Sequence, residues 1–427
     1  MAGGLAAVQA AWAYGLGSKL RMAVDSPGVT DPISYNMAPL RPRVIRRAGI
    51  DGGLIWPPYD LTVCKVSNML RPLYARIDPA AMAHNLRQVR ELAPQARVWA
   101  VVKANAYGHG LNNAIEGLRE ADGFALLEFD NAIALREQMP QQRILLLEGA
   151  FDESSTRLSI ERGFDLAVHD ESQLRWLEAC EGPRRLRVWL KFNSGMNRLG
   201  FTQTGFRQAF ERLVSCSVVD RIGMMTHFAN ADAPDGTAAA QGRFEQACNQ
   251  LPGSRSLANS AACVQVPAAH ANWVRPGIML YGGTPIAERT AASIGLQPAM
   301  HLESKLLAVQ KLLPGDTLGY GSTFTAGRPM RVGVVACGYA DGYPRSAPTG
   351  TPVWVAGQRT RLIGRVSMDM LTVDLDPVPE AGVGAPVQLW GNHVPIDEVA
   401  AAADTIGYEL MCRVSRRVPL LTAGVPW

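Results

Sequence analysis

The sequence feature with the clearest chemical potential is a lysine placed at the end of a buried strand. The segment "AVVKANAYGHG", residues 100–110, puts Lys103 directly after the apolar run Val98–Val102. A lysine there can be a solvated strand end, a structural ion pair or a nucleophile. At the mouth of a barrel, desolvation would lower the pKa of the amine and allow it to form a Schiff base with a carbonyl compound. Covalent catalysis through an amine is therefore the first chemistry to consider.

Two further segments could serve a carbonyl cofactor that carries a phosphate, such as pyridoxal phosphate. "LANSAA" places Asn259 and Ser260 at a strand end before a predicted helix, where a hydroxyl and backbone N–H groups could bind phosphate. "VRPGIMLYGG" supplies Arg275 and the flexible Gly277, whose backbone could approach a phosphate closely. Pyridoxal phosphate needs such a cradle and a partner for its ring nitrogen.

The elements that must position these residues follow a repeating pattern of short apolar runs and amphipathic helical stretches. A first helix is predicted after Asp78, with Pro79 at its first position and apolar residues at helical spacing as far as Leu92. The predicted strands are Val98–Val102, Phe124–Leu127, Ile144–Leu147, Leu166–Val168, Val188–Leu190, Ile222–Thr226, Ser256–Ala258 and Trp273–Ile278. Eight buried strands that alternate with helices predict a (β/α)8 TIM-like barrel.

Polar residues follow these strands, and in such barrels the active site lies at the carboxyl ends of the strands. In chain order they are Lys103, Glu128, Glu148, His169, Lys191 with Asn193, His227, Asn259 with Ser260, and Arg275. Any one of them alone would be ordinary loop chemistry. Together they predict a polar ring around one mouth of the barrel.

Beyond about residue 295 the pattern changes to short apolar runs separated by Gly, Pro and Asp turns, which predicts a mostly antiparallel β domain. Residues 1–68 show no sustained period of either kind. We therefore expect three parts: 1–68 as a disordered extension or a misassigned start, 69–295 as the barrel, and 296–427 as the β domain.

Composition narrows the class of protein. The chain has 427 residues, 47% of them apolar, and a net charge of +4 that gives no reason to expect a nucleic-acid partner. No apolar run is long enough for a membrane span. The seven cysteines form no C-x-x-C pair and the seven histidines show no ligand spacing, so reduced thiols, a cytoplasmic location and no metal site are expected.

Eight segments together resemble the alanine racemase family. They are "AVVKANAYGHG", "LKFNSGMNRLGF", "MTHFANAD", "ANSAA", "VRPGIMLYG", "LGYGSTFTA", "GYADGYPR" and "GRVSMDM", and they occur in the family's order over residues 73–427. The resemblance implies a pyridoxal-phosphate enzyme that interconverts L-alanine and D-alanine and supplies D-alanine for peptidoglycan or serves alanine catabolism.

The resemblance also implies a role for each matched residue. Two are proton-transferring bases: Lys103, which also holds the cofactor, and Tyr320. At the cofactor phosphate, the resemblance places Tyr107, Ser260 with neighbouring Asn259, and the backbone of Gly277 and Ile278. It places His227 near the cofactor ring and Arg275 at the ring nitrogen. Arg198 and the backbone amide of Met368 bind the substrate carboxylate. Tyr320 and Met368 reach the barrel mouth of a partner subunit in the family, so the resemblance implies a homodimer with shared sites.

Some positions differ from the family pattern or allow a second interpretation of their role. Lys191 matches a lysine that is carbamylated in some relatives, but Asn193 stands where many have aspartate, and an ordinary ion pair is the alternative. Arg416 stands where some relatives have a tyrosine that touches the phosphate, so no such role is expected of it. Tyr339, Arg345, Arg365 and Asp232 match residues of the access corridor and can equally be surface side chains.

Three rival functions follow from the same residues. A decarboxylase of related architecture is expected to pair the ring nitrogen with a carboxylate, where this chain has Arg275. A barrel that handles pyridoxal phosphate without catalysis is expected to lack the β domain. A racemase of broader specificity differs only in the packing of its pocket, which the sequence does not reveal.

Overall fold

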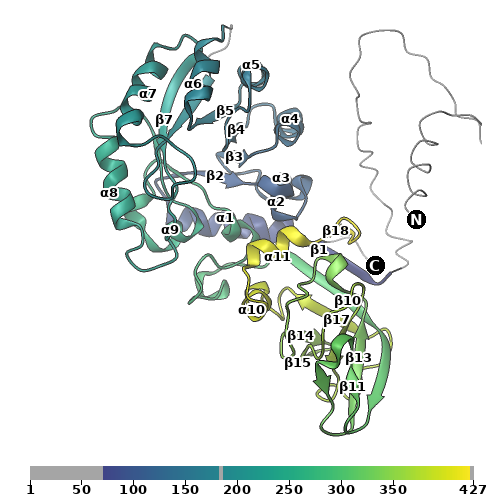
Figure 1. Ribbon diagram of the computed structural model, residues 1–427. Helices are drawn as coiled ribbons and strands as arrows, with labels where there is room; N and C mark the ends of the chain where they lie inside the picture. The colour runs from purple at the N-terminus through teal and green to yellow at the C-terminus, as the bar shows by residue number, and fades with distance from the viewer. Residues whose placement is uncertain (1–70, 182–185, 424–427) are drawn as a thin grey trace, which may run out of the picture. The chain divides into compact units, whose positions relative to one another are not determined.

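The eight predicted apolar runs form the parallel strands of a barrel in the computed structural model, which describes residues 71–181 and 186–423 (Figure 1). The predicted extension, residues 1–68, lies outside the described residues. The strand order is β8-β7-β6-β5-β4-β3-β2-β9. Their bounds are β2 (Arg97–Val101), β3 (Gly123–Leu126), β4 (Arg143–Leu146), β5 (Asp165–Val168), β6 (Leu186–Lys191), β7 (Val219–Met225), β8 (Arg255–Ser256) and β9 (Trp273–Val274).

Backbone hydrogen bonds complete the barrel between its two terminal strands. Asn272 N donates to Arg255 O at 3.2 Å, and Arg275 N donates to Ala258 O at 2.8 Å. The strands of the barrel are buried almost throughout, as expected of a parallel sheet covered by helices. The predicted fold class, a TIM-like barrel with a mostly antiparallel β domain, is confirmed.

Helices connect the strands and surround them in Figure 1. They are α1 (Pro79–Leu92), α2 (Lys103–Tyr107), α3 (Leu111–Gly117), α4 (Phe129–Gln138), α5 (Glu153–Arg162), α6 (Glu171–Glu178), α7 (Gln203–Ser215), α8 (Ala238–Ala247) and α9 (Ser260–Gln265). The predicted cap of α1 is present, because the Asp78 side chain accepts hydrogen bonds from Ala80 N and Ala81 N. Leu92 was predicted on the apolar face but is 37% exposed, so the buried face ends before the last residue of the helix.

The second part of the chain builds a separate sheet. Its strands are β10 (Met300–Leu312), β13 (Met330–Val335), β14 (Pro352–Val355), β15 (Gln358–Arg361), β16 (Leu371–Asp374), β17 (Pro386–Trp390) and β18 (Leu420–Thr422), and β11 (Thr317–Leu318) pairs with β12 (Phe324–Thr325) nearby in sequence. All pairs are antiparallel except the one that β18 makes. Two short helices, α10 (Ile396–Ala402) and α11 (Gly407–Arg413), follow β17.

One strand of the predicted barrel segment pairs outside the barrel. β1 (Leu73–Ile77) lies antiparallel to β10, with Leu73 opposite Ser304, and parallel to β18. The predicted barrel range 69–295 therefore includes a strand of the second sheet, and the division of the chain into three parts stays a prediction. The strand "LYARI" is short and mostly apolar, and its partners come from the other end of the chain, so no local signal in the sequence identifies them.

Three tryptophans fill the barrel interior. The Trp99 ring stacks on Trp273 at a centroid distance of 4.4 Å and meets the edge of Trp189 at 6.1 Å. Neighbouring strands make room for them with glycine. A Cβ at Gly123 would lie 2.2 Å from the Trp99 ring, and a Cβ at Gly223 would lie 2.6 Å from the Trp189 ring. The indole rings therefore occupy the space that side chains at Gly123 and Gly223 would otherwise fill, and together they form one packed layer.

This layer predicts opposite effects for two glycine-to-alanine substitutions. Gly123→Ala should destabilise the protein by about 1–3 kcal/mol, because the added methyl group overlaps a fully buried indole. Gly242→Ala, at an exposed position of α8 with nothing near the new Cβ, should raise stability by up to about 1 kcal/mol. Thermal unfolding of the two variants beside the parent measures both shifts. Equal shifts would contradict the packing described for Trp99.

Candidate active site

A cavity of about 840 Å³ lies at the carboxyl ends of the barrel strands. Its volume suits a small molecule together with a cofactor-sized group. It brings together eight of the residues predicted from sequence, namely Lys103, Tyr107, Arg198, His227, Asn259, Ser260, Arg275 and Gly277. Most of the predicted polar ring therefore lies around one cavity, while Glu128 and Asn193 do not line it.

Lys103 is held at the end of β2 by an unusual backbone turn. The four residues that follow it, from Ala104 to Tyr107, are all left-handed, with φ between 52° and 54°. Each such non-glycine residue costs about 1–2 kcal/mol. The turn is fastened by Ala104 N, which donates to Glu128 Oε1 at 3.1 Å, and it ends at Gly108. Strain of this kind persists where the surrounding structure imposes it, often beside reactive groups.

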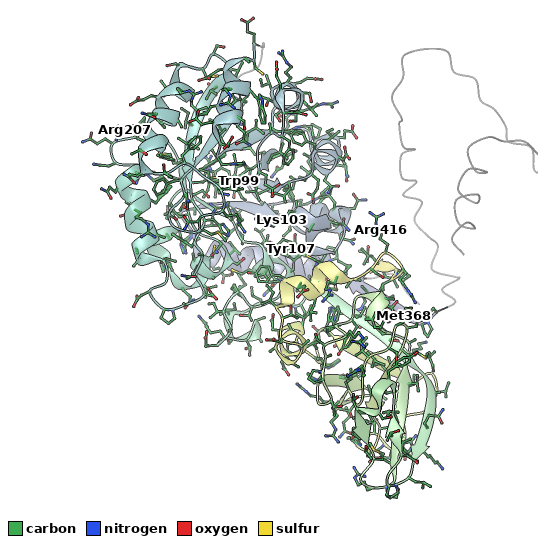
Figure 2. All side chains as sticks on the ribbon, viewed as in Figure 1. Trp99, Lys103, Tyr107, Arg207, Met368 and Arg416 are labelled. Carbon is green, nitrogen blue, oxygen red and sulfur yellow. The ribbon has the colours of Figure 1, made fainter. Side chains whose placement is uncertain are left out.

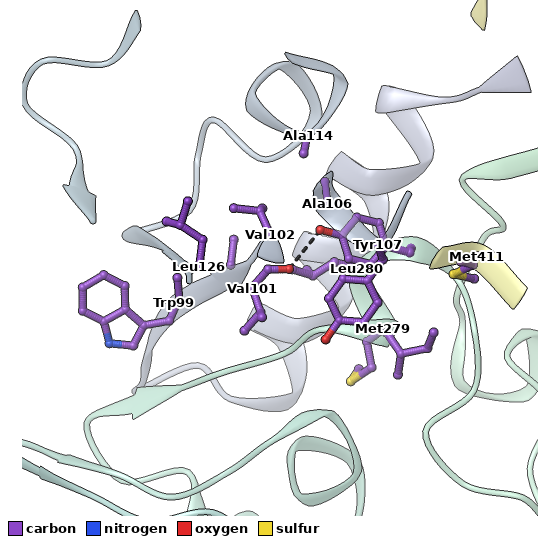
Figure 3. Packing of buried hydrophobic residues seen from close by; sticks show 14 of the residues in the cluster. Trp99, Val101, Val102, Ala106, Tyr107, Ala114, Leu126, Met279, Leu280 and Met411 are labelled. Atoms are coloured by element: carbon purple, nitrogen blue, oxygen red, sulfur yellow. Dashed lines mark hydrogen bonds between the residues drawn. The ribbon is translucent and has the colours of Figure 1, made fainter. Parts of the chain in front are cut away.

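Aromatic packing supports the turn from behind (Figure 3). The Tyr107 ring stacks on Tyr281 at 4.8 Å, and His109 stacks on the same ring at 4.6 Å. His109 Nδ1 donates to the carbonyls of Ala106 and Tyr107, both at 3.0 Å. Burial lowers the pKa of His109 to about 4, so the ring is neutral and remains a donor in this contact at physiological pH. The position of the Tyr107 side chain is thus fixed by the core.

A small anion cradle lies beside Tyr107. Ser260, the first residue of α9, accepts a hydrogen bond from Gly277 N at 2.8 Å. Asn259 caps the same helix by accepting from Ala262 N. A Cβ at Gly277 would lie 2.3 Å from Tyr107 Oη, so only glycine leaves the space in which the hydroxyl and this backbone approach each other. A hydroxyl and a backbone amide thus meet beside the Tyr107 hydroxyl, at the start of α9.

Arg275 is held rigidly by neutral acceptors. Its Nη1 donates to Ser256 Oγ at 2.6 Å, and its Nη2 donates to the Thr226 carbonyl at 2.5 Å. Burial lowers the pKa of Arg275 to about 10, which leaves it positively charged at neutral pH. His227 Nδ1 lies 3.5 Å from Nη2. Burial and the charge of Arg275 lower the pKa of His227 to about 3, so its imidazole is neutral and can accept from the guanidinium.

The cavity carries an excess of positive charge. Lys103, Lys191, Arg198 and Arg275 line it, against the carboxylates of Glu148 and Asp170. Burial, followed by the charges of Arg275 and Arg198, lowers the pKa of Lys191 to about 8. A ligand that carries negative charges would relieve this repulsion. The cavity is therefore suited to an anionic substrate or cofactor.

Three predicted site residues do not line the cavity. Ile278 is fully buried in a 3₁₀ turn, η3 (Ile278–Tyr281). Tyr320, in η5 (Tyr320–Ser322), is 70% exposed, and Met368 is 52% exposed on the β domain (Figure 2). Arg416 is also exposed, and none of the predicted corridor residues lines the cavity: Tyr339, Arg345, Arg365 and Asp232.

Sequence reasoning missed the contribution of α11 to the cavity wall. Tyr408 and Cys412 of this helix line the cavity, and the Tyr408 ring lies 6.0 Å from that of Tyr107. The helix comes close because Gly108 has no side chain: a Cβ there would lie 2.2 Å from Met411 O. The glycine in "AYGHG" was the available signal, but it does not say which segment approaches it.

The other unforeseen residues come from the loops after β4 and β5 and from α6. Phe151, Gln173 and Trp176 join Glu148 and His169 along this wall. Gln173 Nε2 donates to the carbonyls of Glu148 and Ala150, at 2.8 Å and 2.9 Å. These bonds tie α6 to the loop after β4 along one side of the cavity.

Fold and cavity together define a barrel enzyme built around a strand-end lysine in a cationic site. Comparison with known proteins gives the family. Residues 77–285 match the family described as alanine racemase, N-terminal domain, and residues 299–422 match alanine racemase, C-terminal domain.

Individual relatives agree. An alanine racemase of Nitrosospira multiformis is 55% identical over 357 residues, which is 83% of this chain and all of that protein. One from Burkholderia mallei is 54% identical over 353 residues, covering 82% of this chain and 99% of the relative. The crystal structure of biosynthetic alanine racemase from Pseudomonas aeruginosa superposes with a TM-score of 0.81 at 46% identity, covering 83% of this chain and 100% of that one. The chain belongs to the alanine racemase family, and it is an isomerase of the racemase type.

Two kinds of feature are missing from the described residues. No helix among them has the length and apolar character needed to cross a membrane. Within the same residues, no three or more His, Cys, Asp or Glu side chains are grouped so that they could hold a metal ion.

The left-handed turn beside Lys103 predicts an unusual response to glycine. Ala104→Gly should leave stability unchanged or raise it slightly, because relief of about 1–2 kcal/mol of backbone strain offsets the greater freedom of glycine in the unfolded chain. Ala239→Gly, also at an exposed position but in the right-handed helix α8, should cost about 1 kcal/mol. Thermal unfolding of both variants measures the contrast. Equal losses would mean that the turn after Lys103 stores no strain.

Proposed function

We propose that this chain interconverts L-alanine and D-alanine with pyridoxal phosphate, which it binds covalently through Lys103. The observation that carries the proposal is the position of Lys103: its amine lies at the strand end in the same cationic cavity as Arg275 and the Ser260–Gly277 cradle. Within the described residues the amine has no hydrogen-bond or ion-pair partner to compete with a carbonyl carbon. The names of the relatives supply the substrate.

The residues present fit this cofactor. Ser260 and the backbone N–H groups of Gly277 and Ile278 would hold the phosphate, with Asn259 fixing the start of the helix and Tyr107 closing the cradle. His227 would lie against the ring. Pyridoxal phosphate, when bound, withdraws electrons from the substrate Cα and so acidifies its C–H bond.

Arg275 would face the ring nitrogen and keep it unprotonated. Its guanidinium donates to three neutral oxygens and to His227, and it stays positive at neutral pH. Because a guanidinium does not give up its proton, the ring nitrogen would stay unprotonated. This limits electron withdrawal and with it side reactions such as transamination. It also argues against a decarboxylase, in which a carboxylate is expected at this place.

Racemisation needs proton transfer on both faces of Cα, so it needs two bases. Lys103 would serve one face. Tyr320 is exposed and lies outside the cavity of its own chain. We therefore propose a homodimer in which the partner's Tyr320 serves the other face, while Arg198 and the backbone amide of the partner's Met368 bind the substrate carboxylate.

Lys191 is a candidate for carbamylation. A pKa of about 8 leaves an appreciable fraction of neutral amine, which can attack carbon dioxide, form an N–C bond and release a proton. The negative carbamate would then offset the charge of neighbouring Arg198. Asn193, where relatives have aspartate, accepts from Gly195 N and Asn197 N within its own loop, so its substitution does not bear directly on Lys191.

In the cell, the proposed role is cytoplasmic supply of D-alanine for peptidoglycan. The runner-up is a racemase of broader specificity, which would differ only in the packing of its pocket. A barrel that only handles pyridoxal phosphate is disfavoured because this chain carries the complete β domain.

The purified protein should racemise alanine, and Lys103→Ala should abolish this. With pyridoxal phosphate added, conversion of each alanine enantiomer is followed by chiral chromatography, and other L-amino acids serve as a specificity panel. The variant should lose the visible absorbance of covalently bound cofactor and several orders of magnitude in rate. Lys191→Ala is the matched control and should keep that absorbance. If Lys103→Ala kept it instead, another lysine would hold the cofactor.

The dimer proposal predicts complementation between two inactive chains. Tyr320→Phe keeps the ring and removes its only ionisable atom. It should still exchange the Cα proton of D-alanine with solvent deuterium through Lys103, while exchange from L-alanine nearly stops. Mixing Lys103→Ala with Tyr320→Phe chains should restore activity, because one site of each hybrid dimer has both bases. Hybrid dimers without activity would show that Tyr320 is not a base contributed by the partner.

A further inference from the structure

The opposite end of the barrel holds a second cavity, of about 490 Å³. Four arginines line it: Arg97, Arg143, Arg187 and Arg221. They lie at or near the starts of β2, β4, β6 and β7. The catalytic cavity lies at the other ends of these strands, since Lys103 follows β2 and Lys191 ends β6.

Arg143 is the fixed centre of this cluster. Its guanidinium lies over two indole rings, 4.9 Å from the centroid of Trp99 and 4.7 Å from that of Trp273. It pairs with the buried Asp165, which also accepts from Trp189 Nε1 at 3.2 Å. Arg143 Nε is buried and has no hydrogen-bond partner among the described residues. The cluster is therefore preorganised and keeps an unused buried donor.

The positive charges are only partly matched. Asp165 is shared between Arg143 and Arg187, whose Nη1 is 4.0 Å away. Arg221 lies 3.7 Å from Asp220, its neighbour in sequence. Arg97 lies over the Trp273 ring at 5.6 Å and has no carboxylate within 4.0 Å among the described residues. Four cations thus face two carboxylates around one cavity.

A structural role does not account for this arrangement. The amino end of a barrel usually contributes stability, and a stabilising cluster would balance its charges or exclude them. The remaining wall is apolar, formed in part by Phe210, Leu213 and Ile222, so the arginines face a concave space with a hydrophobic side. Arginine forks suit phosphate and carboxylate groups, which they can bind in a bidentate manner.

We propose that this cavity is a binding site for a small polyanion, a molecule with at least two phosphate or carboxylate groups. Arg97 and Arg187 hold the anionic groups, and Arg143, held against the two indoles and Asp165, sets their position. The inference does not depend on the reaction proposed for the other end of the barrel.

Titration calorimetry of the holoenzyme tests the proposal with two probes, pyrophosphate and citrate, at constant ionic strength. In the holoenzyme, the bound cofactor occupies the Ser260–Gly277 cradle, so that site does not take up the probe. The test variant is Arg97→Gln with Arg187→Gln. The control is Arg207→Gln, an exposed arginine on α7 whose one side-chain hydrogen bond within residues 71–181 and 186–423 goes to the Asn249 carbonyl (Figure 2).

At least one probe should bind saturably to the parent and to the control, and at least about tenfold more weakly to the double variant, with the racemase rate unchanged. Preference for pyrophosphate or for citrate identifies the natural ligand as a phosphate or a carboxylate compound. Absence of saturable binding by both probes, or equal affinity in the double variant, overturns the proposal. If the double variant does not fold, Arg97→Gln alone replaces it, since Arg97 leaves no carboxylate unpaired, and the same outcomes apply.

Discussion

The catalytic cavity depends on one constraint, which is the repulsion among its buried positive charges. Lys103, Lys191, Arg198 and Arg275 share one space with few carboxylates. Burial first, and the neighbouring positive charges second, lower the pKa of Lys191 to about 8 and that of His227 to about 3. A phosphate and a carboxylate brought in by ligands would complete the charge balance. The charges of the site would therefore be balanced only when an anionic ligand is bound. Without a ligand, hydrogen bonds to neutral oxygens hold the buried Arg275 in place.

Backbone geometry supplies the second requirement, close approach. The left-handed turn after Lys103 lets Tyr107 turn toward Gly277, and Gly108 lets α11 pack against the turn. Each contact joins segments from different parts of the chain. The helix α11 belongs to the C-terminal part, so the cavity wall includes residues from both halves of the sequence. This arrangement explains why the β domain is tied to the barrel through β1 and α11 as well as through the chain connection after β9.

The two cavities of the barrel are separated by a single layer of aromatic rings. Every second residue of β2 points into the barrel. Arg97 lines one cavity, Val101 lines the other, and Trp99 lies between them. Arg187, Trp189 and Lys191 repeat the pattern along β6. The same two strands thus carry a cation at one end, an indole in the middle and a site residue at the other end. A shift of either strand would move residues that line both cavities, because the indoles between the cavities are closely packed.

The sequence by itself determined the elements and the chemical groups. Runs of three to six residues, most of them apolar, predicted the barrel strands with errors of a few residues, and Asp78 with Pro79 predicted the start of α1. Lys103, Ser260, Arg275 and their motif neighbours were identified because local spacing and family resemblance carry that information. Those signals are short-range: a strand, a cap or a motif is encoded within about ten neighbouring residues.

Tertiary structure decided everything that depends on segments far apart in the chain. Examples are the pairing of β1 with β10, the presence of Tyr408 in the cavity wall and the exposure of Tyr320. The arginine cluster at the other end of the barrel is a further case, since Arg97 and Arg187 are ordinary strand-end residues in the sequence. No local pattern specifies such contacts, because the free energy that selects them comes from burial and charge shared among residues that only the folded chain brings together.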